Sequence, residues 1–198
     1  KDASGNVIKT DTVTGKTDQT VTTNSTVPTG WELTNGQVVP KTITFTGDST
    51  PDTKVTVQHH HSKVSHTDPV PGDGKTPTNK PINGAHDSDL NQTITRTIKV
   101  KDPHTNKVAT TKQVAKIFRD ATVDDVTGEV TYGDWSSDDA NWTDFTPTTI
   151  AGYTPSQSDV AAVTVQNGQK DVTVDITYTA NDQTTHVVYK DASGNVIK

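Results

Sequence analysis

The sequence predicts a strand-dominated α+β protein with two small sheet domains, and three observations lead to this prediction. Thr makes up roughly one residue in five, and Val is the commonest apolar residue. β-Branched side chains suit a half-buried pleated sheet and lose rotamer freedom in helices. Only 28% of the residues are hydrophobic and 5% are aromatic, which suits two thin cores better than one thick core. A chain of 198 residues is long enough for two such domains.

The first half contains three predicted strands. Strict alternation of apolar and polar residues marks 42–46 and 53–58 as strands with one apolar face each. Residues 7–14 form another, after a turn at Ser4-Gly5. The stretch 18–24 could hold one or two helical turns, but its Thr and Asn residues make it a poor helix.

The second half combines further strands with one predicted helix. A short helix is expected around Ser137 to Phe145, where Asp138 or Asp139 could serve as the N-cap. A hairpin, a short helical crossover and further strands favour a sheet domain of the β-grasp type. The strands are expected near 93–101, 107–119, 129–135, 162–166 and 171–179.

Two repeats organise the chain. KDASGNVIK occurs at residues 1–9 and again at 190–198, which predicts a long tandem repeat whose next copy has just begun. A weaker internal repeat places a Gly-aromatic turn before two strands in each half, at Gly30-Trp31 and at Gly152-Tyr153. The halves are therefore expected to be one fold, duplicated and diverged.

The end of the repeat predicts an exchange of strands. Thr184 to Tyr189 reads as a strand that leads into the second KDASGNVIK turn, whereas no such strand precedes residue 1. The N-terminal domain is thus expected to lack its own first strand. Residues 184–190 should either complete the N-terminal sheet of a neighbouring molecule, head to tail, or extend unpaired.

A Pro-rich segment is predicted to separate the two domains. Residues 67–91 hold four of the ten prolines and show no apolar face, so a semi-rigid surface linker is expected. The predicted boundaries are a first domain at 1–66, this linker, a second domain at 92–181 and the start of the next repeat at 182–198.

Several strings resemble a known family. GNVIKTDTVTGKTDQTV, PTGWELTNGQ, PKTITFTGD and TPDTKVTVQH resemble the mucin-binding (MucBP-type) domain of lactobacillus mucus-binding proteins. TITRTIKVKDPHTNKVA, ATVDDVTGEVTYGDWS, TIAGYTP and KDVTVDITYTA resemble the second domain of the same Mub repeat. The resemblance implies two ubiquitin-like β-grasp domains arranged as an elongated rod. It further implies a secreted, cell-wall-anchored adhesin of the bacterial surface that binds mucin glycoproteins, with immunoglobulin binding in some members.

Composition excludes several other classes. Without Cys, a disulfide scaffold, a thiolate metal site and a Cys nucleophile are ruled out. The net charge of -6 and the lack of a basic stripe argue against nucleic acid as a partner. Apolar runs of about four residues are too short for a signal peptide or membrane insertion, so any anchor must lie outside this fragment. No G-x-S-x-G, S-x-x-K or H-E-x-x-H string occurs, and no enzyme activity is expected.

Aromatic residues are the candidate ligand contacts. Trp135 and Trp142 lie in the polar segment GDWSSDDANWTDF and have no counterpart in the first half, and Tyr132 lies nearby. Aromatic faces stack on sugar rings and anchor interfaces. Trp31 and Tyr153, at equivalent positions of the two halves, are expected to be core residues instead.

No cofactor is expected, and two clusters are weak candidates for an incidental metal ion. His59 and His61 would share one face of a strand and could hold Zn²⁺ or Ni²⁺, although a polar strand end is the simpler interpretation. A group of acidic residues could offer oxygens to Ca²⁺, but it lacks the regular D-x-D-x-D-G spacing, and a solvated acidic loop is the simpler interpretation. Its members are Asp134, Asp138, Asp139 and Asp144.

Three functions are compatible with the sequence. The preferred one is adhesion to host mucus glycoproteins, with many weak repeats acting together through high effective concentration. The first alternative is a module that binds protein, with immunoglobulins as the partner that the resemblance suggests. The second is a passive spacer that contacts only neighbouring repeats and projects a distal tip.

Overall fold

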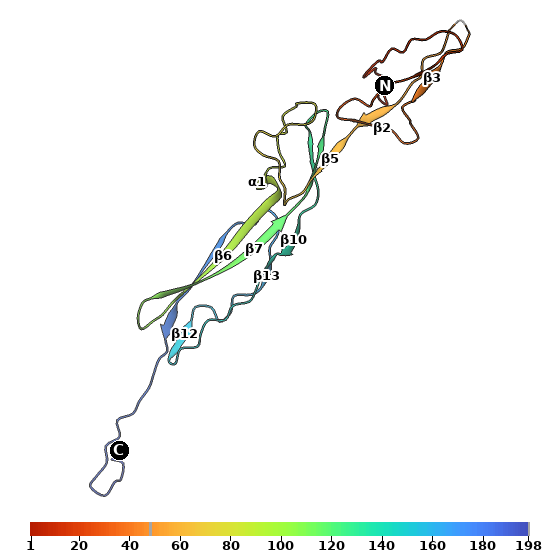
Figure 1. The fold of residues 1–198 in the computed structure, drawn as a ribbon. Coiled ribbons are helices and arrows are strands. Elements are labelled where there is room, and N and C mark those ends of the chain that lie inside the picture. Colours follow the sequence, from red (N-terminus) through yellow and green to blue (C-terminus); the bar gives the residue numbers. More distant parts are fainter. Residues whose placement is uncertain (48, 198) are drawn as a thin grey trace. The chain divides into compact units, whose positions relative to one another are not determined.

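The computed structural model describes residues 1–47 and 49–197 and is dominated by strands, which confirms the predicted fold class at this level (Figure 1). In chain order the elements are β1 (Thr20–Thr22), β2 (Trp31–Leu33), β3 (Thr42–Thr44), β4 (Val57–His59), β5 (His61–Val64), α1 (Asp87–Leu90), β6 (Asn91–Lys101), β7 (Val108–Phe118), β8 (Ala121–Asp124), β9 (Val130–Tyr132), β10 (Ser136–Asp139), β11 (Asn141–Trp142), β12 (Tyr153–Pro155), β13 (Val163–Thr164), β14 (Val172–Ile176) and β15 (Tyr178–Ala180). The helix α1, with four residues, is too short to cross a bilayer.

The chain forms two compact units. The first comprises Lys1–Gln92 and Ile117–Asp138, and the second comprises Thr93–Lys116 and Asp139–Lys198. This division differs from the boundaries expected from the sequence, which remain a prediction.

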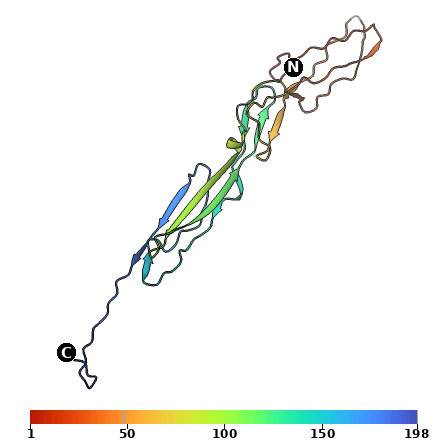
Figure 2. The ribbon, with the colours of Figure 1, turned by 60° about the vertical axis from the view of Figure 1, so that its left-hand side comes forward.

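A four-stranded sheet in the order β10-β7-β6-β14 contributes its long strands to the second unit. β6 and β7 are neighbours joined by a turn in which the Asp102 amide donates to the Lys107 carbonyl at 2.9 Å. β14 runs parallel to β6 on its other side, and both figures show these strands side by side (Figures 1 and 2). The two parallel strands bury Ile98 and Ile176 completely, and Val160 covers them.

The N-terminal module, which we define as residues 1–59, contains two short pairs of strands. β1 pairs antiparallel with β3, where Val21 faces Ile43. β2 pairs antiparallel with β4. Although 7–14 was predicted as a strand, no strand is assigned there in the described chain, and residues 7–13 line a hollow instead.

The internal repeat has a structural counterpart in the turns before β2 and β12. Gly30 and Gly152 both adopt a φ of 80°, which glycine takes without steric cost. In each turn the amide of the aromatic residue, Trp31 or Tyr153, donates to the carbonyl three residues earlier at 3.1 Å. The two halves thus build the same turn from the same Gly-aromatic pair.

The strand pairing that follows each turn has the same register in both halves. β2 pairs with β4 as β12 pairs with β15, antiparallel in each case. The paired positions are Trp31 with His59 and Leu33 with Val57 in the first half, and Tyr153 with Ala180 and Pro155 with Tyr178 in the second. Residues 55–59 of the first half therefore correspond to residues 176–180 of the second.

A three-stranded sheet, β5-β8-β9, lies in the first unit and packs on the segment predicted as a linker. Ala85 and Leu90 from that segment are fully buried beside Ala121. The Val70 amide donates to the Ala85 carbonyl at 2.8 Å, which closes a loop over the sheet. Residues 67–91 thus contribute side chains to the core. The sequence did not predict this, because the apolar residues of the segment follow no regular period.

The predicted helix around Ser137–Phe145 is wrong, because the strands β10 and β11 occupy this stretch. Asp138 and Asp139, expected at a helix N-cap, lie within β10. Pairing of β11 with β13, in which Trp142 faces Val163, outweighs the weak local helix signal.

Candidate functional site

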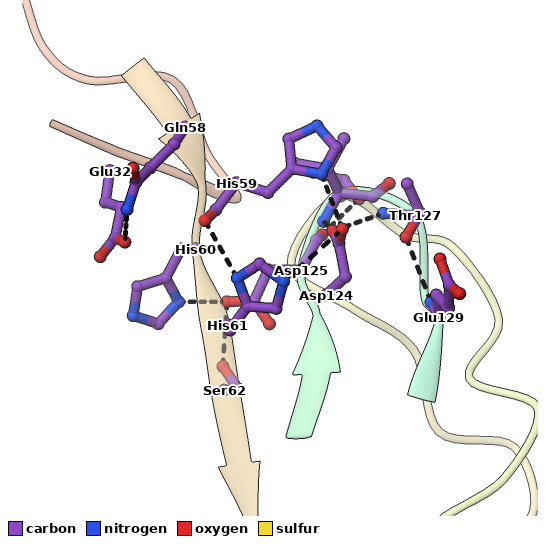
Figure 3. Close-up of polar contacts among 12 residues, drawn as sticks. Glu32, Gln58, His59, His60, His61, Ser62, Asp124, Asp125, Thr127 and Glu129 are labelled. Atoms are coloured by element: carbon purple, nitrogen blue, oxygen red, sulfur yellow. Dashed lines mark hydrogen bonds and ion pairs between the residues drawn. The ribbon is translucent and has the colours of Figure 1, made fainter. Parts of the chain in front are cut away.

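Three consecutive histidines at the junction of β4 and β5 face two consecutive aspartates at the end of β8 (Figure 3). His59 Nδ1 lies 2.7 Å from Asp124 Oδ2, and His61 Nε2 lies 3.9 Å from the same oxygen. His60 Nδ1 lies 2.6 Å from Asp125 Oδ2. His59 and His61 thus share one aspartate while His60 turns to the other, as alternation along an extended chain requires.

Two groups of this cluster have shifted pKa values, the Asp124 carboxyl and the His60 imidazole. Partial burial raises the pKa of Asp124, but hydrogen bonds from His59 and from the backbone amides of Thr127 and Val126 outweigh it and lower the pKa to about 2. The hydrogen bond to Asp125 raises the pKa of His60 above its usual 6.5. The cluster therefore ties the β4–β5 junction to the turn after β8 by charge-assisted hydrogen bonds.

The metal candidates are not assembled into a metal site. Among residues 1–47 and 49–197, no group of three or more His, Asp or Glu side chains is arranged to hold an ion. His59 and His61 are engaged with a single carboxylate. The acidic candidates Asp134, Asp138, Asp139 and Asp144 are all exposed.

A second cluster, the Arg119 platform, consists of Arg119, Tyr132 and Trp135. The guanidinium carbon lies 3.8 Å from the centroid of the Tyr132 ring and 4.6 Å from that of Trp135. Arg119 Nε donates a hydrogen bond to the Asp89 carbonyl at 2.8 Å, and the Tyr132 hydroxyl accepts one from the Ala85 amide at 3.1 Å. These bonds fix the cation against the rings, and all three side chains of the platform remain partly exposed.

The sequence predicted two members of this platform and missed the third. Tyr132 and Trp135 were candidate ligand contacts, and the structure brings them together on one cation. Arg119 was overlooked, although a signal existed. The chain has only two arginines, Arg96 and Arg119, and each lies over an aromatic ring.

Trp142 occupies a different environment from the platform. Its side chain is 2% exposed, and its indole N–H donates to the Ile94 carbonyl at 3.4 Å. The guanidinium of Arg96 lies 5.3 Å from its ring. Because both faces of a buried ring are covered, the structure speaks against Trp142 as a surface for stacking a sugar.

The two expected core aromatics are half-buried. Trp31 meets His59 edge-on, with ring centroids 4.5 Å apart, and Tyr153 meets His104 edge-on at 5.0 Å. In the described part of the chain, their ring contacts are thus with histidines and not with an arginine. The platform is therefore the candidate binding site, and its chemistry is that of aromatic faces beside a fixed positive charge.

Comparisons with known proteins show which family and which solved structures the chain is similar to. Residues 85–182 match the family model of the Muc B2-like domain. The structure named Mub-RV has 22% identity and a TM-score of 0.58, with 90% of this chain and 94% of that chain covered, and this likeness shows a shared fold. A type 2 repeat of the mucus binding protein MUB from Lactobacillus reuteri has 25% identity over 90% of this chain and 94% of that chain, with a TM-score of 0.38. The mucin-binding domain of Spr1345 from Streptococcus pneumoniae has 29% identity over 47% of this chain and 94% of that chain, with a TM-score of 0.41.

Among curated proteins no relative matches the chain. The family match and the solved structures confirm the resemblance that the sequence strings predicted. Residues 85–182 belong to the Muc B2-like domain family, and the chain is a repeat of the Mub and MucBP kind.

Proposed function

We propose that this chain is a repeat unit of a secreted bacterial surface adhesin that binds host mucus glycoproteins and catalyses no reaction. The observation that carries the proposal is the match of residues 85–182 to the Muc B2-like domain. The same segment contains Tyr132, Trp135 and Arg119, so the matched family and the candidate site coincide in sequence.

The Arg119 platform is suited to glycans that carry an acidic group. A partly exposed indole such as Trp135 offers a flat apolar face on which a sugar ring stacks. Arg119 Nε donates to a backbone carbonyl, and the terminal nitrogens of a guanidinium are suited to pair with a carboxylate or sulfate. Mucin chains ending in sialic acid or sulfate present both features.

Two ubiquitin-like β-grasp domains are the proposed architecture. Its support is the parallel pairing of β14 with β6, next to the neighbouring β7, because strands from the two ends of a domain then meet in the middle of one sheet. The shared register of β2–β4 and β12–β15 supports a second copy of the same plan. The arrangement of the two domains as a rod and anchoring to the cell wall stay predictions.

Weak contacts repeated along one chain are the proposed source of affinity. Linked sites raise the effective concentration of each other, so a repeat that binds poorly alone contributes strongly in an array. The reappearance of KDASGNVIK at 190–198 is the feature that supports such an array.

The decisive experiment measures binding of the full chain to immobilised mucin before and after treatment with sialidase or periodate. We expect treatment to reduce binding, and we expect Trp135→Ala and Arg119→Lys to reduce it several-fold. Tyr153→Ala, a half-buried aromatic outside the platform, is the matched control and should bind like the unaltered chain. Circular dichroism of each variant separates loss of binding from loss of folding.

Other outcomes would redirect the proposal. Equal binding to stripped mucin would indicate recognition of protein, and a pull-down with immunoglobulin would then test that partner. Absence of binding by arrays of several repeats would indicate a passive spacer.

A further inference from the structure

The two long strands of the second unit have one buried face and one open face. Along β6, Ile94, Arg96 and Ile98 are buried and the residues between them are not. On β7, exposed Val114 likewise precedes buried Ala115. Side chains alternate between the two faces of a sheet, so the intervening residues share the open face. We call it the Lys–Thr face, and it comprises the odd-numbered residues of 93–101 and the even-numbered residues of 108–116.

A backbone bond near each end of the β6–β7 pair fixes its register. The strands are neighbours joined by residues 102–107, a connection short enough for an antiparallel hairpin. At the turn the Asp102 amide donates to the Lys107 carbonyl at 2.9 Å, and at the far end the Arg119 amide donates to the Leu90 carbonyl at 2.9 Å. Counting inward from either bond pairs the same residues, so both bonds define one register.

Three lysines form a stripe on the Lys–Thr face. In this register Lys112 of β7 lies opposite Thr97 of β6, and Lys99 and Lys101 follow Thr97 along its own strand. At about 3.4 Å per residue, they lie about 7 and about 14 Å beyond the row of Lys112. All three lysines are exposed. Within residues 1–47 and 49–197, no ion pair or hydrogen bond engages their ammonium groups.

The stripe has the opposite sign to the chain as a whole. The protein carries a net charge of -6, whereas neither 93–101 nor 108–116 contains an Asp or a Glu. Lys116 lies on the same face and already has an interaction of its own. On the adjacent edge strand β14, Asp175 faces Lys99 in the register. No basic stripe is visible in the sequence, because the lysines alternate with core residues and come from two strands.

Hydroxyl groups lie between these cations. Thr95 and Thr97 are alternate residues of β6 on the face, and Thr110 of β7 stands opposite Lys99. A threonine hydroxyl both donates and accepts hydrogen bonds, as the hydroxyls of a sugar require. The two strand segments contain no aromatic residue, so this face offers no ring on which a nucleic-acid base could stack. Its chemistry therefore suits an anionic glycan better than a nucleic acid.

We propose that the Lys–Thr face binds an extended sulfated glycan of host mucus, with sulfate groups on Lys99, Lys101 and Lys112 and sugar hydroxyls on the threonines between them. This inference rests on the proposed function and adds a second glycan site to it. Sialic acid ends a glycan chain, whereas sulfate is carried by successive sugars, and a row of cations needs a row of anions. Lysine is a point charge that pairs with an anion without a fixed geometry, so it tolerates variable sulfate spacing.

Binding of the full chain to dextran sulfate at low salt tests this proposal, with uncharged dextran as the blank. The lysine variant combines Lys99→Gln, Lys101→Gln and Lys112→Gln. We expect it to bind at least about ten-fold more weakly and with a smaller dependence on salt. The control variant makes the same change of net charge at three exposed lysines of the first unit and combines Lys16→Gln, Lys41→Gln and Lys80→Gln. Equal weakening by both variants, or no binding of dextran sulfate, would overturn the proposal.

Removing a neighbouring carboxylate gives a test of the opposite sign. Asp175→Asn takes away the negative charge that faces Lys99, so binding of dextran sulfate should tighten by about two-fold or more. Asp159→Asn is the matched control, because Asp159 is exposed beside Val160, whose side chain covers the buried face. Equal tightening by the two variants would mean that only net charge matters, and it would contradict a site on the Lys–Thr face.

Mucin with and without its sulfate separates this inference from the function on which it rests. The lysine variant should bind native mucin more weakly than the unaltered chain, and desulfation of the mucin should remove that difference. Equal binding of both chains to native mucin would refute this site and leave the adhesin function standing. Binding of dextran sulfate through the lysines without binding of mucin would refute the function, and host mucus as the source with it. Tighter binding of single-stranded DNA or polyphosphate of equal charge would refute the assignment to a sulfated glycan.

Discussion

Replacing Gln113 with Met should destabilise the second unit by about 3 kcal/mol, because Gln113 satisfies a buried guanidinium. Arg96 is 3% exposed and donates through Nε and Nη2 to Gln113 Oε1 at 2.8 and 2.5 Å. Its remaining bonds go to the carbonyls of Ala161, at 2.7 Å, and Thr143. All of these acceptors are neutral, so these hydrogen bonds, together with the contact of the guanidinium with the Trp142 ring, offset the cost of burying the charge.

The magnitude follows from the two bonds that Met cannot accept. Hydrogen bonds to charged groups contribute about 1.5–3 kcal/mol each. Gln113 is half-buried, so water replaces part of the loss, and about 3 kcal/mol is the expected net cost. At an m-value of about 1.5 kcal/mol per molar, the urea midpoint should fall by roughly 2 M.

Urea unfolding followed by tryptophan fluorescence measures this cost in chains whose Trp31 and Trp135 are replaced by Phe, because the signal then comes from Trp142, whose ring lies beside Arg96. Gln183→Met, at an exposed position, is the matched control and should stay within about 0.5 kcal/mol of the unaltered chain. If Gln113→Met also stays within that range, the acceptor does not hold the guanidinium, and the reasoning is refuted.

Three further predictions concern Asp124, His60 and the two Gly-aromatic turns. The pKa of Asp124 is lowered to about 2, so its contribution to stability is complete above pH 3.8 and is lost as the pH falls towards 2. The loss should reach about 2 kcal/mol, and the acid unfolding curve of Asp124→Asn should be flatter between these pH values. Because the pKa of His60 is raised, its contribution to stability is complete below pH 6.5 and is lost as the pH rises through the pKa of the folded state. NMR titration should place the midpoint of His60 above pH 6.5, and Asp125→Asn should return this midpoint to the usual value. Gly30→Ala and Gly152→Ala both place Ala at a φ of 80°, but only the Cβ at position 30 would meet neighbouring atoms, at 2.7 and 3.0 Å. Thermal melts should therefore show a loss of stability of about 1 kcal/mol for Gly152→Ala and a clearly larger loss for Gly30→Ala.

Long strands were predictable because their patterns are local. The predicted strands 93–101 and 107–119 correspond to β6 and β7, and burial alternates along β6 and along the C-terminal half of β7. The strand predicted at 7–14 differs, because a strand needs a paired neighbour and residues 7–13 line a hollow instead. Propensity could not supply that partner.

The candidate site was half predictable for a similar reason. Aromatic residues in a polar segment identified Tyr132 and Trp135, but Trp142 from the same segment is buried. Arg119 comes from a different strand region and reaches both rings only when β8 and β9 pair. Which of three similar aromatics faces solvent depends on contacts between distant residues, and periodicity does not encode them.

The sequence by itself determined the strand-rich class, the repeated KDASGNVIK turn and the kinship with mucus-binding repeats, because β-branched content, turn residues and family strings are properties of short segments. Tertiary structure alone decided that residues 67–91 supply core side chains, that the three histidines meet Asp124 and Asp125, and that Arg119 joins two aromatic rings. These contacts join residues far apart in the chain, and only the pairing of strands brings such residues within the few ångströms over which hydrogen bonds and ring contacts act.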